Sequence, residues 1–589
     1  MLFNAKNLLN DKNILDISSR DLSYSPLFST IGLVSPFDFP GIKSLALNYN
    51  RTSRMVWNNF IKFEDGLLRV PTSIDRLCFE NDNSRVTLAF YAKDSFVIEA
   101  ENTESIELCS MLAEDSVSIW AEEASSEQII LRGYSLNTDP RDPDKSAPFR
   151  AGIKAINGKI SEFGSKITVK ADNHGRIYLA FSFEALETSL ESIIETLSKS
   201  PISMAEGLAL SREWFVDMLL GFEASVNSER ESRIVAKALK SLLFNATIGQ
   251  GFLRGYVSAF PSRGKYPTHY LWDSCFQNLA LEYLNPKLAK DSMLLYNNCQ
   301  RSDGKFPHFI CSTWFRPHDT QPPLIGWATL RLVKSSSEKD EDFMQKMLSA
   351  LEKNNEWWLN QRMTRHGVIY CPHGLETGQD DSPRFDDGPI LAVDMNSYLL
   401  NQMKSTSELA AILGNEASSE KWRREADTLS KNIVKVMYDP EENIFFDADV
   451  KTAEHKTLWS ASAFLPLWAG VDIKADKARE MIKNHLLDKE KFFGKVPFPC
   501  IAYNQKEYRC DKWWRGPLWL SLAWLMVETL EKYGFEKEYN QVSKTYYDML
   551  LNDGNLREHF NSQTAEGLGT YDQGWTSAIF IKLNKLLNG

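Results

Sequence analysis

The sequence predicts a mainly α protein, in which an (α/α)6 barrel follows an N-terminal β-sandwich-like domain and linker helices. Three observations predict this arrangement. The first third of the 589 residues contains short stretches typical of strands, whereas the rest shows helical periodicity. The loops between the predicted helices are alternately short and long, so the helices pair into hairpins. We therefore expect domains at 1–187 and 228–589, joined by linker helices at 188–227.

Several segments in the first third are typical of strands. Arg85–Glu101, Ser116–Ala121 and Gln128–Tyr134 are rich in β-branched and aromatic residues, and apolar and polar residues alternate in part of them. Two further strands flank a turn at Asp172–Gly175. Short strands separated by Gly, Asn, Asp and Ser turns favour a β-sandwich-like domain. Helical periodicity begins near Leu190, where the linker helices are predicted.

Twelve helices are predicted after Ser228. Every second connection is short, and the remaining loops are long and rich in Trp, Pro, Gly, Asp and Glu. Because antiparallel hairpins place all their long loops at one end, six hairpins in a ring form a barrel whose active site lies at one mouth. An open superhelix is the alternative, but no sequence repeat supports it. The predicted helices are 228–247, 272–284, 286–300, 321–335, 340–362, 393–413, 417–437, 458–470, 475–488, 514–533, 536–551 and 572–588.

Composition disfavours several classes of function. The 67 Lys and Arg against 78 Asp and Glu give a formal net charge of −11, which disfavours nucleic acids and anionic membranes as partners. The first residues lack the apolar segment of a secretory signal, and no apolar run reaches the roughly 20 residues of a membrane span. We therefore expect a cytoplasmic protein. The eight Cys and nine His show no metal-ligand spacing, so neither a metal nor a cofactor is predicted.

The long loops carry clusters of polar and aromatic residues. Hydrolysis of a glycosidic bond needs one carboxylic acid and one carboxylate, but no metal. Asp380 and Glu558 lie in two of these loops and are candidates for that pair, and neighbouring Trp and Arg side chains are suited to bind a sugar. The clusters are Tyr266–Phe276, Gly304–His308 with Gln321–Ala328, Glu376–Asp386, Trp513–Trp519, and Arg557–Asn561 with Tyr571–Trp575.

Each cluster also has a structural interpretation. The acidic turn around Asp380 is typical of a solvated loop, Asp273 of a helix cap, and Pro517 of a first helical turn. The 16 Trp residues could likewise belong to large cores. The clusters occur in nearly every long loop and almost never in the short ones, and structural caps would not be distributed in that way. This distribution favours a functional site.

The five clusters resemble the motifs of the inverting (α/α)6 glycosidases, the clan that includes glycoside hydrolase family 63 and the family 37 trehalases. The resemblance covers Ser228 to the last residue, with the motifs in the family's order. It implies that Asp380, the last residue of an E-[ST]-G-x-D motif, is the general acid and that Glu558 is the general base. It places Trp272, Asp273, Gln321, Arg384, Trp514, Arg515 and Trp575 around the sugar, and we add Glu376 and Trp519 from the same motifs as substrate-binding residues.

Two departures separate this chain from a strict trehalase. Gln379 stands where trehalases favour Trp, and the glycine-rich segment before Trp575 is short. The chain is more similar to prokaryotic members that act on α-glucosides, α-mannosides and mannosylglycerate. We therefore expect an inverting, exo-acting glycosidase that removes an α-linked glucosyl or mannosyl residue from a small glycoside or oligosaccharide.

The mechanism expected of such an enzyme requires Asp380 to be protonated at the working pH. Burial and the neighbouring Asp381 favour that state, whereas Arg384 opposes it. A related phosphorylase, a non-catalytic sugar-binding protein and a terpene cyclase are the alternatives, although the intact Glu558 argues against the first. The N-terminal domain has three possible roles, namely to shape the site, to form a homo-oligomer or to stabilise the barrel.

Overall fold

The computed structural model divides into two compact units, Met1–Thr268 with Cys311–Trp314 and His269–Ile310 with Phe315–Gly589. The predicted boundaries after residues 187 and 227 stay predictions. Ser116 and Pro267, which belong to a predicted strand and a predicted cluster, lie outside the described residues. The structure describes residues 2–4, 9–10, 23–24, 31–34, 42–49, 55–70, 73, 75–108, 117–136, 146–163, 166–185, 189–219, 221–248, 255–262, 265–266, 268–310, 318–336 and 339–589.

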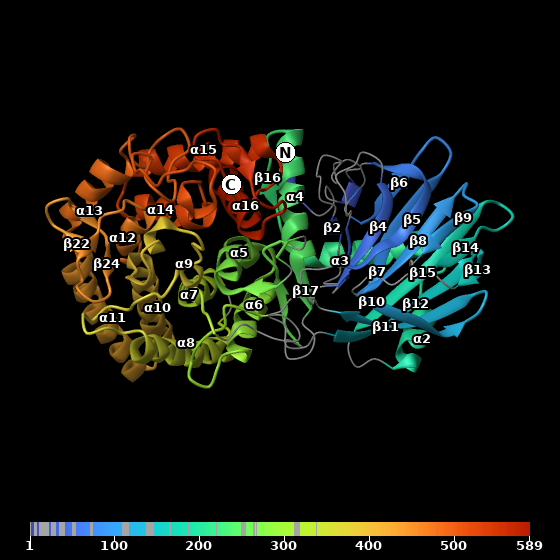
Figure 1. Ribbon diagram of the computed structural model, residues 1–589, viewed down its shortest axis with the longest axis horizontal. Helices are drawn as coiled ribbons and strands as arrows, with labels where there is room; N and C mark the ends of the chain where they lie inside the picture. Colours follow the sequence, from blue (N-terminus) through green and yellow to red (C-terminus); the bar gives the residue numbers. More distant parts are fainter. Residues whose placement is uncertain are drawn as a thin grey trace. The chain divides into compact units, whose positions relative to one another are not determined.

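The first unit is rich in β-sheet, as predicted. Fourteen strands pair in the order β10-β11-β12-β15-β8-β7-β6-β5-β4-β3-β2, with β9, β14 and β13 branching from β5 (Figure 1). The long strand β5 pairs with β4 and β9 over its first part and with β6 over Leu68–Val70, so it joins two antiparallel ladders. The strands are β2 Ser23–Tyr24, β3 Ile31–Val34, β4 Ile42–Tyr49, β5 Met55–Val70, β6 Leu77–Glu80, β7 Arg85–Ala92, β8 Ser95–Glu101, β9 Ser105–Leu108, β10 Val117–Ala124, β11 Gln128–Leu136, β12 Ser146–Asn157, β13 Lys159–Phe163, β14 Ile167–Lys170 and β15 Arg176–Ala185.

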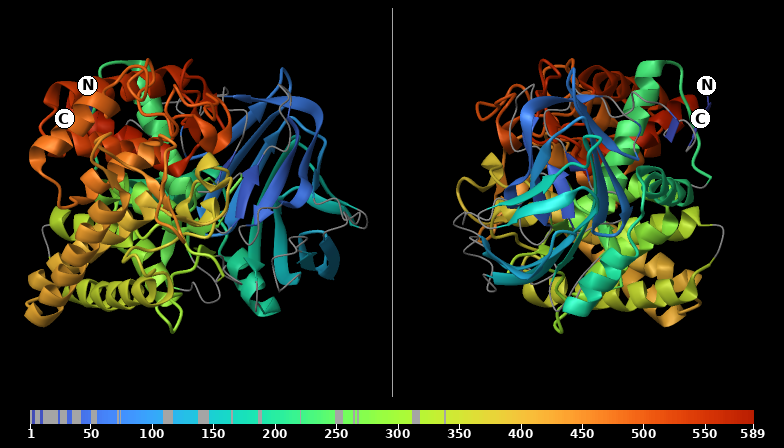
Figure 2. Two further views of the ribbon diagram at one scale, coloured as in Figure 1. Left: turned by 60° about the vertical axis from the view of Figure 1, so that its left-hand side comes forward. Right: turned by 90° about the vertical axis from the view of Figure 1, so that its right-hand side faces the viewer.

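The two predicted linker helices pack on one of these ladders. Helix α2 (Leu190–Ser198) contacts β12 and β15, and α3 (Met204–Met218) contacts β7 and β8 (Figures 1 and 2). Ser189 and Ser203 begin them as N-caps, since each hydroxyl accepts a backbone N–H of the first turn. Their apolar side chains join residues of the sheet in one buried cluster, which fixes both helices on the same face.

All twelve predicted helices are present. The first, α4 (Glu229–Asn245), belongs to the first unit, and the other eleven make the second unit mainly helical. Those eleven are α5 Leu271–Leu284, α6 Pro286–Asn298, α7 Ile325–Ser335, α8 Glu341–Gln361, α10 Val393–Ile412, α11 Glu416–Met437, α12 Leu465–Ala469, α13 Ala475–Met481, α14 Leu520–Lys532, α15 Glu536–Asp553 and α16 Gly574–Asn588; a further short helix, α9, spans Gly374–Thr377.

Three helices begin at least four residues later than predicted. The predicted helix 458–470 begins at Leu465, after a 3-10 turn at Ala461–Phe464. The predicted helix 321–335 begins at Ile325, and the predicted helix 514–533 begins at Leu520, after a separate 3-10 turn at Trp513–Arg515. In the last two cases proline precedes the helix, and the residue before a proline is disfavoured in the helical conformation. The delayed starts leave Gln321 in a loop and Trp514 in the 3-10 turn before α14.

Six helices of the second unit contact one another in a closed order. Helix α5 contacts α7, α7 contacts α10, α10 contacts α12, α12 contacts α14, α14 contacts α16, and α16 contacts α5 (Figure 1). Helices α6, α8 and α11 begin at capping side chains of Asn285, Asp340 and Asn415. In contrast, α5, α7, α10, α14 and α16 begin without a side-chain cap, after long loops. Four of the five clusters identified in the sequence reach one of these uncapped starts, and the fifth, Glu376–Asp386, lies in the loop before α10.

Candidate active site

The N-terminal ends of three of these helices meet through tryptophan side chains. Trp272 lies in the first turn of α5, Trp575 in the first turn of α16, and Trp519 directly before α14. The ring centroids are 6.0 Å apart for Trp272 and Trp575, and 5.9 Å apart for Trp519 and Trp575. The structure therefore brings together three predicted substrate-binding residues from distant parts of the sequence.

Flat rings stack beside this meeting point. The rings of Trp514 and Trp519 are 3.8 Å apart with an interplanar angle of 9°, and His559 stacks on Trp519 at 4.4 Å and 10°. Trp272 joins the group with its ring 5.8 Å from that of Trp514. The carbonyl of Trp513 accepts a hydrogen bond of 3.0 Å from Nε1 of Trp519, which fixes the middle ring of the stack. An ordered aromatic wall of this kind is suited to a sugar ring.

Glu558 lies at the edge of this wall. Its Oε2 atom accepts a hydrogen bond of 3.0 Å from the backbone N–H of Thr570, and its own carbonyl accepts one of 3.0 Å from Nε1 of Trp575. The short strands β26 (His559–Phe560) and β27 (Gly567–Leu568) pair directly beside it. These bonds hold the buried carboxylate in one orientation.

Asp273 is a buried carboxyl group whose pKa is affected by both predicted catalytic residues. Burial raises its pKa well above the usual value, and the negative charges of Glu558 and Asp380 raise it further. Hydrogen bonding to its own backbone N–H and to Trp272 acts in the opposite direction. Since both carboxylates act on Asp273, the structure brings Asp273, Asp380 and Glu558 into one electrostatic group.

Asp380 is exposed, so the burial expected from the sequence is wrong for this residue. It follows a tight turn at Gly378, which has a left-handed φ of +73°. A side chain at position 378 would lie 2.7 Å from the indole of Trp272, so glycine permits the close approach of this loop to that ring. The loop of the predicted general acid therefore packs directly on the aromatic wall.

The residues after Asp380 tie its loop to the loop before α14. The carboxylate of Asp381 accepts a hydrogen bond of 2.9 Å from the backbone N–H of Trp514. Arg515 donates two hydrogen bonds, of 2.6 and 3.1 Å, to Asp386. The Arg515 side chain retains 31% exposure, so it lies at the rim of the loops.

Gln321 supports the start of α5. Its Oε1 atom accepts a hydrogen bond of 3.1 Å from the backbone N–H of Trp272, and its Nε2 atom lies 3.5 Å from Nε2 of His308. Because α5 begins without a side-chain cap of its own, this glutamine satisfies one of the first free amides of the helix. Gln321 therefore contacts Trp272 directly.

Glu376 forms an ion pair with another side chain of the protein. Its carboxylate accepts a hydrogen bond of 2.8 Å from Arg362 and is only 1% exposed. Burial raises the pKa of Glu376, and the positive charges of Arg362 and Lys305 oppose that rise. The observed contact of this predicted substrate-binding residue is thus an ion pair within the protein.

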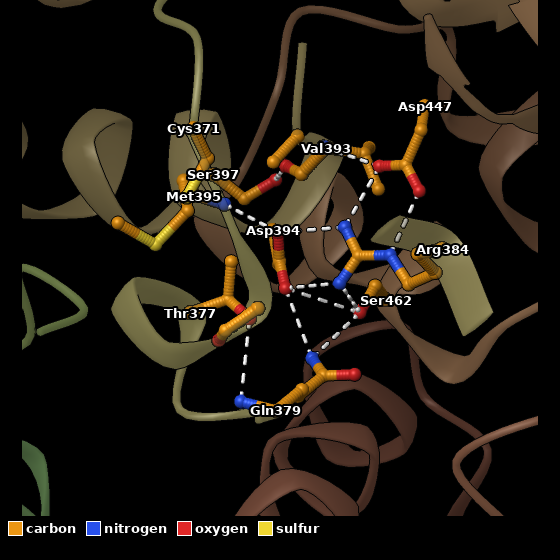
Figure 3. A network of polar contacts seen from close by, with 12 residues as sticks. Cys371, Thr377, Gln379, Arg384, Val393, Asp394, Met395, Ser397, Asp447 and Ser462 are labelled. Carbon is orange, nitrogen blue, oxygen red and sulfur yellow. Dashed lines mark hydrogen bonds and ion pairs between the residues drawn. The ribbon is translucent and has the colours of Figure 1, made fainter. Parts of the chain in front are cut away.

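Arg384 is also engaged inside the protein (Figure 3). Its guanidinium donates to both oxygens of Asp447, at 2.7 Å each, and to Oδ1 of Asp394 at 2.8 Å. The side chains of Arg384 and Asp394 have no exposed surface. The opposing influence of Arg384 on Asp380, which the sequence suggested, is therefore balanced by two carboxylates.

Two residues of the site were quoted within the clusters but given no role from the sequence. His559 extends the stack of Trp514 and Trp519, as described above. Gln573 precedes α16 and has no exposed surface, yet neither of its amide atoms has a hydrogen-bond partner among the described residues. A buried amide without partners is costly, so it marks a place for water or a polar ligand group. Its position two residues before Trp575 was the available signal.

The part of the chain that the structure describes contains no group of three or more His, Cys, Asp or Glu side chains arranged to hold a metal ion. None of its helices combines the length and apolar character needed to span a bilayer.

Known proteins resemble this chain. The mannosylglycerate hydrolase MGH1-like glycoside hydrolase domain matches residues 266–576. The mannosylglycerate hydrolase MGH1 of Selaginella moellendorffii is 22% identical over 410 residues, which cover 56% of this chain and 82% of that protein. The glucosylglycerate hydrolase of Mycolicibacterium hassiacum is 21% identical over 412 residues, covering 54% and 91%.

A solved structure shares the fold. The family 63 mannosylglycerate hydrolase from Thermus thermophilus, in complex with glucose, superposes with a TM-score of 0.52 at 19% identity, covering 59% of this chain and 99% of that one. The resemblance drawn from the five clusters is thereby confirmed at the level of the family. The match to residues 266–576, which is more than half of the chain, shows that this protein belongs to the mannosylglycerate hydrolase MGH1-like glycoside hydrolases and is a glycosidase of the family 63 type.

Proposed function

We propose that this glycosidase is inverting and exo-acting, and that it removes an α-linked glucosyl or mannosyl residue from a small glycoside or oligosaccharide. The observation that carries the proposal is the electrostatic group of Asp273, Asp380 and Glu558 beside the aromatic wall. Inversion needs an acid on one face of the sugar and a base on the other. Asp380 and Glu558 come from separate loops, which is compatible with such a placement.

In the proposed mechanism, Asp380 donates its proton to the glycosidic oxygen while Glu558 accepts a proton from the attacking water. The exposed position of Asp380 suits a group that must reach a leaving group and be reprotonated from solvent. The buried Glu558, oriented by the amide of Thr570, suits a base that must hold one water in line with the anomeric carbon. Pairs of this kind lie roughly 6.5–9.5 Å apart.

The sugar ring is proposed to bind against the ring edges of the tryptophans. We propose that Asp273, Gln321 and Gln573 contribute polar groups there, because all three are buried beside the wall. We propose that Glu376 and Arg384 position loops instead of touching sugar, since their charges are satisfied inside the protein. The remaining proposed contacts are Trp272, Trp514, Arg515, Trp519 and Trp575.

We further propose that the closed series of helices is the inner wall of an (α/α)6 barrel, with α6, α8, α11 and α15 in the outer layer. The cyclic contacts of α5, α7, α10, α12, α14 and α16 support this arrangement. In the first unit, we propose a β-sandwich-like fold. The two antiparallel ladders that share β5 support it.

The substrate proposed here is a hexose linked to a small alcohol or hydroxy acid. The two relatives described above carry the names of mannosylglycerate and glucosylglycerate hydrolases, which supports such a substrate class. A panel of α-linked disaccharides, mannosylglycerate and glucosylglycerate, scored for released hexose, tests the proposal.

The same panel distinguishes the mechanism. Product anomers followed by NMR immediately after mixing should show the β-hexose first, because one displacement inverts the α-linkage. The initial appearance of the α-anomer would exclude inversion. A requirement for phosphate would identify a phosphorylase, and the absence of any released sugar would favour a binding protein. Asp380→Asn and Glu558→Gln should each lose most of the activity of the wild type, by about 100-fold or more.

A further inference from the structure

Gln379 is the residue directly before the proposed general acid, and its side chain is hydrogen-bonded to the buried residues around Arg384. The amide is 1% exposed, and its Nε2 atom donates hydrogen bonds of 2.9 Å to Asp394 and 3.1 Å to Ser462 (Figure 3). Its Oε1 atom has no hydrogen-bond partner among the described residues, so the two donor bonds are the polar anchors of this side chain. Glutamine can make both bonds from one nitrogen, whereas the tryptophan that trehalases favour here has one N–H.

The partners of Gln379 belong to a rigid buried cluster. Arg384 bridges Asp394, at the start of α10, and Asp447, on β24 (Asp447–Asp449), through paired hydrogen bonds. The first amides of α10 also donate to these carboxylates, from Val393 to Asp447 at 2.9 Å and from Met395 to Asp394 at 2.8 Å. Paired guanidinium–carboxylate bonds hold a defined geometry. Removing Arg384 would leave two buried carboxylates uncompensated, and its paired bonds hold both of them in place.

The main chain around Gln379 is confined as well. Its N–H lies 3.2 Å from the carbonyl of Gly374, and its carbonyl accepts an N–H from Ser382 at 3.0 Å. A Cβ atom at position 374 would lie 2.8 Å from the carbonyl oxygen of Asp380, so the chain passes close to α9 at this point. The hydrogen bonds of the Gln379 side chain and of its main chain together restrict the conformation of the chain at Asp380.

We propose that Gln379 is a positioning residue that fixes the general acid Asp380 through its bonds to Asp394 and Ser462. The inference rests on the proposed function of Asp380 as proton donor. Gln379 does not touch the reacting atoms, so its loss should impair proton donation and leave sugar binding and water attack intact. The loss of kcat should therefore depend on how much the leaving group needs a proton.

A comparison of two substrates with different leaving groups tests this dependence. An alkyl or sugar leaving group needs a proton from the acid, whereas fluoride departs from a glycosyl fluoride with little need of one. The test uses the preferred glycoside of the wild type and the α-fluoride of the same hexose. Gln379→Met, which keeps the length of the side chain but removes both donors, should lower kcat on the glycoside by about 100-fold while KM changes by less than about threefold. Its kcat on the fluoride should change by less than about threefold.

Gln402 provides a matched control. It is also fully buried, its Nε2 atom also donates two hydrogen bonds (2.9 Å each, to Asn354 and Asn355), and its Oε1 atom also has no partner within the described residues. Gln402→Met should therefore disturb packing to a similar extent and affect the two substrates equally. Asp380→Asn provides the reference pattern for a missing acid, with loss on the glycoside and little loss on the fluoride.

The outcomes separate the positioning role from the proposed function. An equal loss on both substrates for Gln379→Met, or no loss on either, overturns the positioning role. If the wild type cleaves neither substrate, the proposed function fails first. Should Gln379→Met fail to fold, Ser462→Ala, which removes one of the two acceptors, should show the same selective loss to a smaller extent, and an equal loss there also overturns the proposal.

Discussion

The backbone N–H of Trp514 donates a hydrogen bond of 2.9 Å to the carboxylate of Asp381, the residue that follows the proposed general acid. This bond joins the loop of the acid to the stack of aromatic rings. Gln379 anchors the other side of Asp380 to the buried arginine cluster. The two sequence neighbours of Asp380 are thus tied to different parts of the second unit, which explains how an exposed carboxyl group can be held in place.

Removal of the Asp381 carboxylate should loosen Trp514. Asp381→Ala leaves the Trp514 amide without its partner, which costs about 1–3 kcal/mol for a buried donor. We expect kcat/KM to fall by about tenfold, mainly through KM, because the stacked ring is proposed to bind sugar. Asp381→Asn retains an accepting oxygen and should stay close to the wild type. Asp387→Ala, in the same loop but with a side chain that is 87% exposed, is the control for altered loop charge. A loss in Asp387→Ala equal to that in Asp381→Ala would contradict the prediction.

A methyl group at position 378 should displace Trp272. The added Cβ atom would lie 2.7–2.9 Å from three atoms of the indole, and alanine also disfavours the φ of +73°. The positive φ alone costs alanine roughly 1–2 kcal/mol. Gly388→Ala measures that cost by itself, because Gly388 has a φ of +99° and no atom lies near the added methyl group. We expect both variants to lower Tm, but only Gly378→Ala to raise KM and alter the tryptophan fluorescence. Unchanged KM in Gly378→Ala would show that Trp272 does not contact the substrate.

A methyl group at position 569 should act on the proposed base. Its Cβ atom would collide with Oε2 of Glu558, the atom that the Thr570 amide holds. Gly414 is a matched control, since it has the same φ of +73° and open space around it. We expect Gly569→Ala to reduce kcat by about 100-fold, as misplacement of a catalytic group does, and Gly414→Ala to leave kcat unchanged. Equal kcat values in the two variants would contradict the assignment of Glu558.

Local signals account for much of what the sequence predicts. Helical periodicity and loop length predicted the twelve helices, and the clusters at their starts predicted the meeting of Trp272, Trp519 and Trp575. Local signals do not reveal where a charged side chain finds its partner. Arg384 stands four residues after Asp380 and has the chemistry of a sugar ligand, yet Asp394 and Asp447 occupy its guanidinium. These partners come from two other segments, so only the tertiary fold determines the role of Arg384.

The same limit applies to burial. The acidic turn at Asp380 and the helix start at Asp273 read alike in the sequence, as polar residues suited to caps or solvent. In the structure Asp380 is exposed, whereas Asp273 is buried beside two other carboxylates. The sequence predicts a raised pKa for Asp380, whereas in the structure burial raises the pKa of Asp273.

Asp273 should therefore lower stability when it ionises. Its folded pKa lies well above the unfolded value of 3.8, so the folded state binds the proton more tightly. The free energy of unfolding then falls as pH rises from about 4 through the folded pKa. Asp273→Asn stays neutral at every pH, and we expect it to raise the free energy of unfolding by at least about 1 kcal/mol at pH 7.5, with little effect near pH 4. The same variant should lose activity, because Asp273 is proposed to bind sugar.

Asp340 is a carboxyl group whose pKa is lowered in the folded state, so its effect on stability should change with pH in the opposite direction to that of Asp273. A hydrogen bond from Lys290 holds the pKa of Asp340 below its usual value, so its charge stabilises the folded state above the unfolded pKa and that contribution is lost as pH falls. Asp340→Asn keeps an N-cap side chain but loses the charge, and should lower Tm more at pH 7.5 than at about pH 2.5, which lies below the unfolded pKa of 3.8. Calorimetry of Asp273→Asn at pH 7.5 and 4, and of Asp340→Asn at pH 7.5 and about 2.5, measures the contrast. A lower Tm for Asp273→Asn at pH 7.5 would show that the ionised Asp273 carboxylate is stabilised in the site. It would contradict the raised pKa of Asp273 and with it the electrostatic group of Asp273, Asp380 and Glu558.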